Sequence, residues 1–130
     1  MSTYQNFEDL EVWKLSRALN NALYDVLDPK PEFSNGYLKN HLLKTAGSIM
    51  DNIAEGFERE GNKEFIQFLF IAKGSAGELR SQLMRAMDFN FITTSEFNEL
   101  KDRVRYISRQ LKHFIKYLKS TSHNGNKHKK

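Results

Sequence analysis

Apolar residues recur at three- and four-residue spacing in four stretches of this chain, which is the pattern of amphipathic helices. The spacing predicts helices over about 7–27, 36–59, 63–89 and 94–119. Pro29 and Pro31 break the chain after the first stretch, and Ser34 or Asn35 is expected to cap the second. Because short connections make successive helices antiparallel, we expect residues 1–120 to form one all-α domain, an up-down antiparallel four-helix bundle.

The later junctions carry more specific start and stop signals. Gly61 is a natural helix stop, and Asn62 is the predicted N-cap of the helix over 63–89. Thr93 begins the sequence TTSE, which is a capping box: the Thr93 hydroxyl and the Glu96 carboxylate satisfy each other's backbone donors. The polar, basic stretch 121–130 has no apolar anchors and is predicted to be a disordered tail.

The apolar faces of these helices define the expected core. The helix over 94–119 carries a heptad seam, formed by Phe97, Leu100, Val104, Ile107, Leu111, Phe114 and Leu118. The predicted core residues are Trp13, Ile49, Ile53, Leu69, Leu79, Leu100, Val104, Ile107 and Leu111. Ile66, Phe70 and Ile71 spread around the start of the helix over 63–89, which is more apolar surface than one partner needs, so we expect a homo-oligomer.

A polar motif interrupts the apolar pattern of the second helix in SIMDNIAEGF, at 48–57, and continues on the third helix. Its members are Asn52, Glu55, Gly56, Ser75 and Glu78. Glycine inside a helix costs about 1 kcal/mol relative to alanine, and a buried amide needs partners. We expect Gly56 to let another backbone or a bulky ring such as Trp13 come close, and Asn52 to be hydrogen-bonded and to fix register rather than bind a ligand. The two polar stretches are predicted to form one buried network between helices or subunits.

Composition narrows the class of protein. The chain of 130 residues contains no cysteine, which excludes disulfides, thiolate zinc sites and cysteine nucleophiles. Its N-terminus lacks the features of a secretory signal, and its longest apolar cluster, FIQFLFIA, is far shorter than the roughly 20 residues of a membrane span. We therefore expect a cytoplasmic protein without a membrane partner.

Charge is distributed unevenly along the chain. Residues 103–130 contain nine Lys and Arg and no Asp or Glu, whereas residues 1–102 contain eleven basic and sixteen acidic residues. Basic side chains recur beside the seam of the last helix, and these candidate phosphate contacts are Arg103, Arg105, Arg109, Lys112, Lys116 and Lys119. Tyr106 and Tyr117 are candidates for stacking. The alternative interpretation of these basic residues is a solvated helix face.

Three motifs, in this order along the chain, resemble those of a known family. FEDLEVW at 7–13, SIMDNIAEGF at 48–57 and KEFIQFLFIAKGSAGEL at 63–79 resemble the bacterial four-helix-bundle family related to the large-subunit rRNA intervening-sequence proteins, which are ribosomal-protein-like. The resemblance implies an up-down bundle that assembles into a ring-like homo-oligomer, most often a pentamer, without an established enzymatic activity. The structurally related accessory proteins of diversity-generating retroelements use a basic surface to engage nucleic acid and a reverse transcriptase.

These observations favour a non-enzymatic binding module that uses no cofactor and associates with RNA or DNA through the phosphate backbone. The second hypothesis is a protein-interaction scaffold for a nucleic-acid enzyme. The third is a metal-dependent hydrolase that uses Asp51, Glu55 and Glu58, whose spacing places three carboxylates on one side of a helix. No matching carboxylate pair occurs on the helix over 63–89, and His41 and His113 stand alone, so a metal site is disfavoured.

Overall fold

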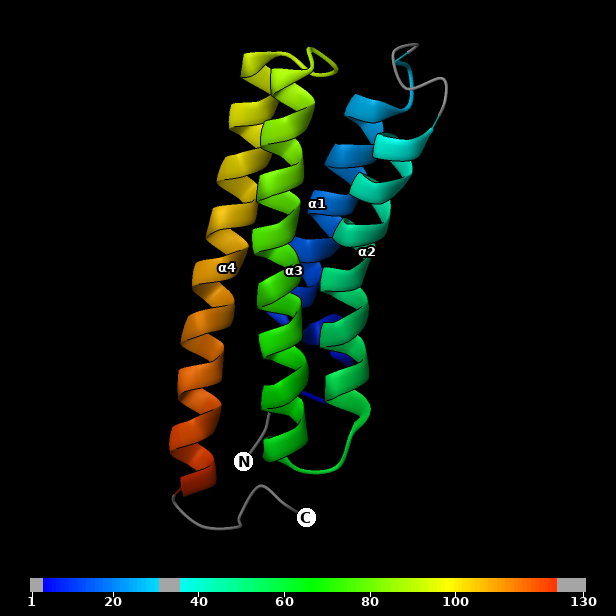
Figure 1. The fold of residues 1–130 in the computed structure, drawn as a ribbon. Coiled ribbons are helices and arrows are strands. Elements are labelled where there is room, and N and C mark those ends of the chain that lie inside the picture. Colours follow the sequence, from blue (N-terminus) through cyan, green and yellow to red (C-terminus); the bar gives the residue numbers. More distant parts are fainter. Residues whose placement is uncertain (1–3, 31–35, 124–130) are drawn as a thin grey trace.

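The computed structural model describes residues 4–30 and 36–123, and within them it contains a 3-10 turn and four α-helices. The 3-10 turn spans Phe7–Asp9, and the helices are α1 (Glu11–Leu27), α2 (Tyr37–Glu58), α3 (Asn62–Asp88) and α4 (Thr94–His123). Each helix runs opposite to the one before it, so α1 begins and α4 ends at the same end of the molecule (Figure 1). The expected up-down four-helix architecture is therefore present.

The four helices enclose one apolar core. α1 packs against α2 and α4, and α3 also packs against α2 and α4. The predicted core residues that are at most 1% exposed are Ile49, Ile53, Leu69, Leu79, Leu100, Val104, Ile107 and Leu111. Trp13 is only partly buried at the edge of the core, where it meets the Phe7 ring edge-on with ring centroids 5.2 Å apart. The prediction of Trp13 as a core residue was wrong because its ring covers the core instead of filling it.

The first helix begins later than the apolar pattern suggested. Phe7–Asp9 form the 3-10 turn, and the Asn6 N–H donates to Asp9 Oδ2 at 3.2 Å. Leu10 then has an extended backbone, with φ −75° and ψ 132°, and its side chain is 1% exposed. The extended residue places the Leu10 side chain in the core, and α1 starts only after it, at Glu11.

The junction between α2 and α3 differs from the predicted capping arrangement. Gly61, with φ +91°, immediately precedes α3, and Asn62 is the first residue of that helix instead of its cap. The Asn62 amide donates to Leu118 O at 3.4 Å and to Thr121 Oγ1 at 3.1 Å. Asn62 therefore ties the start of α3 to the C-terminal part of α4.

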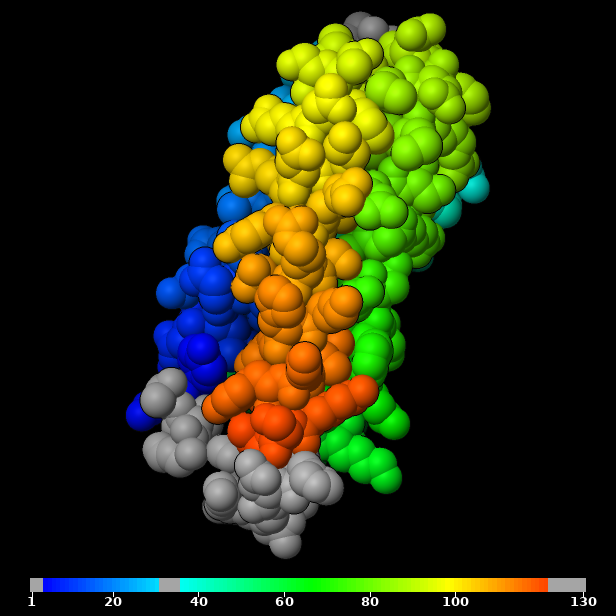
Figure 2. Space-filling model, turned by 90° about the vertical axis from the view of Figure 1, so that its left-hand side faces the viewer, coloured from blue at the N-terminus to red at the C-terminus, as the bar shows by residue number. Residues whose placement is uncertain are grey.

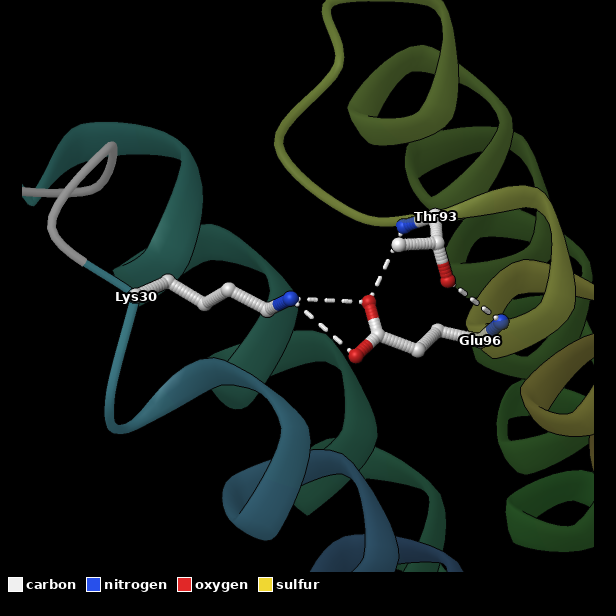
Figure 3. Close-up of polar contacts among 3 residues, drawn as sticks. All are labelled: Lys30, Thr93 and Glu96. Atoms are coloured by element: carbon white, nitrogen blue, oxygen red, sulfur yellow. Dashed lines mark hydrogen bonds and ion pairs between the residues drawn. The ribbon is translucent and has the colours of Figure 1, made fainter.

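The capping box at the start of α4 is confirmed. The Glu96 N–H donates to Thr93 Oγ1 at 3.0 Å, and the Thr93 N–H donates to Glu96 Oε1 at 2.9 Å. Lys30, which follows α1, also reaches both oxygens of the Glu96 carboxylate, at 2.9 and 3.0 Å (Figure 3). Burial raises the pKa of Glu96, but the hydrogen bonds from Lys30 and Thr93 and the Lys30 charge outweigh it, so the pKa lies below its ordinary value.

The end of α4 also corrects the sequence-based boundaries. α4 continues to His123, so residues 121–123 of the predicted tail are helical, and Thr121 is tied to Asn62. Ile115 is 4% exposed and belongs to the core, whereas Phe114 of the predicted seam is partly buried beside it. A straight helix drifts away from a strict seven-residue repeat, which explains the change of seam residue. The predicted caps Ser34 and Asn35 and the stretch 124–130 lie outside the described residues.

Within the described ranges, the structure has no helix that is both long enough and apolar enough to cross a membrane.

Candidate nucleic-acid interface

A row of basic side chains follows the outer side of α4. Figure 2 shows α4 along the middle of one face of the molecule, with α1 on one side and α3 on the other. The members of this row, called here the α4 stripe, are all exposed: Arg105, Arg109, Lys112, Lys116 and Lys119. At 1.5 Å per residue, the stripe is about 21 Å long from its first to its last member. The Arg109 guanidinium carbon lies 5.5 Å from the centroid of the Tyr106 ring, which is 44% exposed.

Arg103 does not belong to the α4 stripe. It precedes Lys112 by nine residues, which is two and a half helical turns, so the two side chains leave α4 on opposite sides. Arg103 also lies 3.9 Å from the Glu99 carboxylate. Arg103 therefore lies apart from the α4 stripe, and its role as a phosphate contact stays a prediction.

The C-terminal half of the α4 stripe borders a groove between α3 and α4. This feature, called here the lysine groove, has a volume of about 200 Å³ and is lined by Phe70, Lys73, Lys112, Ile115, Lys116 and Lys119. Phe70 is 49% exposed, and Lys119 Nζ lies 5.2 Å from the centroid of its ring. Phe70 and Lys73 were missed as candidate binding residues, although the excess apolar surface at the start of α3 was visible in the sequence.

A larger hollow of about 560 Å³ lies on the other side of the C-terminal half of α4. Its aromatic wall includes Phe65, Phe114 and Tyr117; the first two rings meet edge-on at 5.6 Å, and the last two stack at 6.4 Å. His113 and Gln110 line the same hollow. His113 therefore faces away from the α4 stripe, and Tyr117 stacks within the aromatic wall.

The polar motif holds α2 and α3 in register. The Asn52 amide donates to Ser48 O at 2.8 Å and to Ser48 Oγ at 3.0 Å, and Ser48 Oγ lies 3.0 Å from Ser75 Oγ. Ser48 thus joins the two predicted residues across the helix pair, a role that sequence reasoning missed. Its four-residue spacing from Asn52 was the available signal, since such a pair shares one helix face.

The two carboxylates of the predicted network lie outside it. Glu55 is exposed and pairs with Arg59 at 2.9 Å. Glu78 is also exposed, and its carboxylate accepts a hydrogen bond from the Gln82 amide at 3.4 Å. Gln82 is 3% exposed; its Nε2 lies 3.5 Å from His41 Nδ1, while its Oε1 is buried without a hydrogen-bond partner. Within one chain the expected single network is therefore not formed: two separate polar clusters link α2 and α3, and Glu55 and Glu78 are exposed. A network between subunits stays a prediction.

Gly56 allows α2 and α3 to approach closely. A Cβ atom placed on Gly56 would lie 2.6 Å from Phe68 Cβ and 3.0 Å from Phe65 Cδ1. The expected close approach of bulky rings is therefore present, but the rings are those of Phe65 and Phe68 on α3 and not that of Trp13. The glycine is required by helix packing at this point.

The acidic residues of α2 do not form a metal centre with other side chains of the described residues. Asp51, Glu55 and Glu58 are all exposed. In residues 4–30 and 36–123, no group of three or more His, Asp or Glu side chains is arranged to hold a metal ion. The geometry gives no support to the hydrolase hypothesis.

Comparison with known proteins identifies the family. The family model described as 23S rRNA-intervening sequence protein matches residues 8–113. This chain belongs to that family. A search of curated proteins finds no match.

A solved structure supports the same fold. It is a protein of unknown function from the S23 ribosomal protein family of Bacteroides thetaiotaomicron, with a TM-score of 0.74 and 21% sequence identity. The similarity covers 81% of this chain and 98% of that one. Neither the family description nor this neighbour indicates a catalytic activity.

Proposed function

We propose that this protein is a non-enzymatic, homo-oligomeric helical bundle that binds nucleic acid through phosphate contacts along the α4 stripe. The observation that carries the proposal is the exposure of Arg105, Arg109, Lys112, Lys116 and Lys119 on one side of a single helix. Within the described part of the chain, no carboxylate lies within ion-pair distance of these five side chains. The stripe is therefore available to an external polyanion.

The charge distribution supports this assignment. All sixteen acidic residues of the chain precede residue 103, while residues 103–130 contain nine basic residues. A straight row of cations on a rigid helix matches a regularly charged backbone, and it provides no side-chain pattern for reading base edges. We therefore propose recognition of backbone and shape in a structured RNA or in DNA.

We further propose that the chain self-associates through the outer face of α3. Ile71 and Met84 on this helix are 51% and 47% exposed. Gly74 and Gly77 leave open space, since a Cβ atom on either would meet nothing within 4 Å. Small residues beside exposed apolar ones allow a second helix to approach. A ring-like assembly, such as the pentamer that the family resemblance implies, would repeat the α4 stripe and raise avidity by multivalency.

The second candidate is a scaffold for a nucleic-acid enzyme, and the same exposed face of α3 supports it. In that case Ile71 and Met84 would contact the enzyme. Light scattering separates the two uses of this face: self-association gives a mass above the 15.2 kDa of the chain without any partner. A monomeric mass would favour the scaffold.

The nucleic-acid proposal is tested by two double variants with equal loss of charge. Arg105→Gln with Arg109→Gln removes two cations from the α4 stripe, whereas Lys14→Gln with Lys44→Gln removes two exposed cations from α1 and α2. Binding of a fluorescent structured RNA is measured at one low salt concentration, with oligomer mass checked in the same buffer. The proposal predicts that only the stripe variant weakens binding. Equal weakening by both variants, or no binding by the unmodified chain, contradicts it.

A further inference from the structure

We propose that the lysine groove binds a single-stranded segment of nucleic acid, with phosphates held by the lysines and an unpaired base stacked on Phe70. The inference rests on the proposed function and adds a site and a preferred substrate class to it. Two helices build the site: Phe70 and Lys73 come from α3, and Lys112, Lys116 and Lys119 come from α4.

The groove combines an apolar floor with a cationic rim. Phe70 and Ile115 are its apolar lining residues, and all its other lining residues are lysines. Within residues 4–30 and 36–123, no carboxylate lies within ion-pair distance of any of these lysines. Four like charges around one small groove repel each other, so an anion that enters the groove relieves that repulsion.

Phe70 supplies an aromatic ring, which can stack with a base but is not needed to bind a phosphate. Phe70 is 49% exposed, and Lys119 Nζ lies 5.2 Å from the centroid of its ring. A phosphate bound by Lys119 would therefore lie beside the ring, and the attached base would be within reach of it. Cationic grooves with an exposed aromatic ring are typical of single-strand binding, because every base has a face that can stack.

Charge and geometry favour a single strand over a duplex and over a second copy of this chain as the occupant of the lysine groove. The bases of a duplex are stacked on each other, so a duplex can contact the lysines but cannot place a base on Phe70. Two copies of the same groove would bring eight lysines together, which disfavours an isologous contact between subunits at this site. Nucleic acid with unpaired bases fits both the charge and the ring.

The test compares two exposed phenylalanines. Phe70→Ala removes the ring from the groove, whereas Phe89→Ala removes a ring of similar exposure, 57%, that does not line the groove. Binding of a short labelled oligouridylate and of an RNA duplex of equal length is measured by fluorescence anisotropy. Loss of one stacked base is expected to weaken oligouridylate binding by about 5- to 150-fold. Phe70→Ala should leave duplex binding nearly unchanged, and Phe89→Ala should leave both unchanged.

Two further variants make the result specific. Phe70→Trp keeps a stacking surface and should restore oligouridylate binding. Lys73, on α3, lines the groove, whereas Lys44, on α2, does not. Lys73→Gln should therefore weaken oligouridylate binding more than the control Lys44→Gln. Oligomer mass is measured for every variant, because a role of Phe70 in assembly would change the mass and weaken both probes together.

The outcomes separate the inference from the proposed function. Equal weakening of oligouridylate and duplex by Phe70→Ala, or no effect of Phe70→Ala on either, overturns the single-strand site, while duplex binding through the α4 stripe still stands. No binding of either probe by the unmodified chain overturns both. Selective loss of oligouridylate binding in Phe70→Ala, with rescue by Phe70→Trp, supports the site.

Discussion

Gly56→Ala is predicted to destabilise the bundle, although alanine is the better helix former. A Cβ atom at this position would lie 2.6 Å from Phe68 Cβ, which is fixed to the α3 backbone, and 3.0 Å from Phe65 Cδ1. Carbon atoms pack best at about 3.5–4.0 Å, so α2 and α3 must separate by about 1 Å. Overpacking of this kind costs about 3 kcal/mol at the upper end of its usual range. The gain in helix propensity is about 1 kcal/mol, which leaves a net loss of about 2 kcal/mol.

The loss is measured as the change in free energy of unfolding in urea and in Tm, both followed by circular dichroism at one protomer concentration. For a chain of this length, a loss of about 2 kcal/mol lowers Tm by about 6–10 °C. Gly47→Ala is the matched control on the same helix, because a Cβ atom there meets nothing within 4 Å. It should stabilise the protein by up to about 1 kcal/mol. A Gly56→Ala variant as stable as the unmodified chain would refute the close-packing explanation.

Three other variants test single contacts. Glu96→Gln should lower the free energy of unfolding by about 0.5–1 kcal/mol at pH 7. Because the pKa of Glu96 is lowered in the folded state, the ionised carboxylate stabilises the fold at pH values above the ordinary carboxyl pKa. Urea titrations should show that the difference in free energy of unfolding between the unmodified chain and Glu96→Gln disappears as pH falls through the pKa of Glu96 in the folded state. Gln82→Met removes the buried Oε1, which has no hydrogen-bond partner, together with two long hydrogen bonds of the side-chain amide. Because the cost of the unpaired oxygen is expected to exceed the gain from these two bonds, Tm should rise, and a lower Tm would contradict this. Asn62→Ala removes the link to Thr121, and hydrogen exchange should accelerate in the last turn of α4 but not in its first.

Local patterns predicted the helices well, because helix periodicity and capping depend on residues three or four positions apart. The Thr93–Glu96 capping box is of this kind and is present as expected. The missed contacts join residues far apart in the sequence, such as Asn62 with Thr121 and Lys30 with Glu96. No periodicity within one helix reveals which residue of another helix lies opposite.

In the candidate interface, too, features set by spacing within one helix were predicted, and contacts between helices were missed. The α4 stripe follows from spacing within one helix, and the same spacing places Arg103 on another side of α4. The lysine groove depends on how α3 lies against α4, since it unites Phe70 and Lys73 with Lys116 and Lys119. Phe70 was visible in the sequence only as excess apolar surface, for which self-association was the simpler explanation.

The dependence of RNA affinity on salt concentration tests the central claim most directly. The logarithm of the association constant is measured against the logarithm of salt concentration for the unmodified chain and for the two double variants. The account predicts a steep linear decrease for the unmodified chain and for Lys14→Gln with Lys44→Gln. For Arg105→Gln with Arg109→Gln, it predicts a slope smaller by about 1.4–1.8, because two phosphate contacts are lost. One common slope for all three proteins would contradict phosphate binding by the α4 stripe.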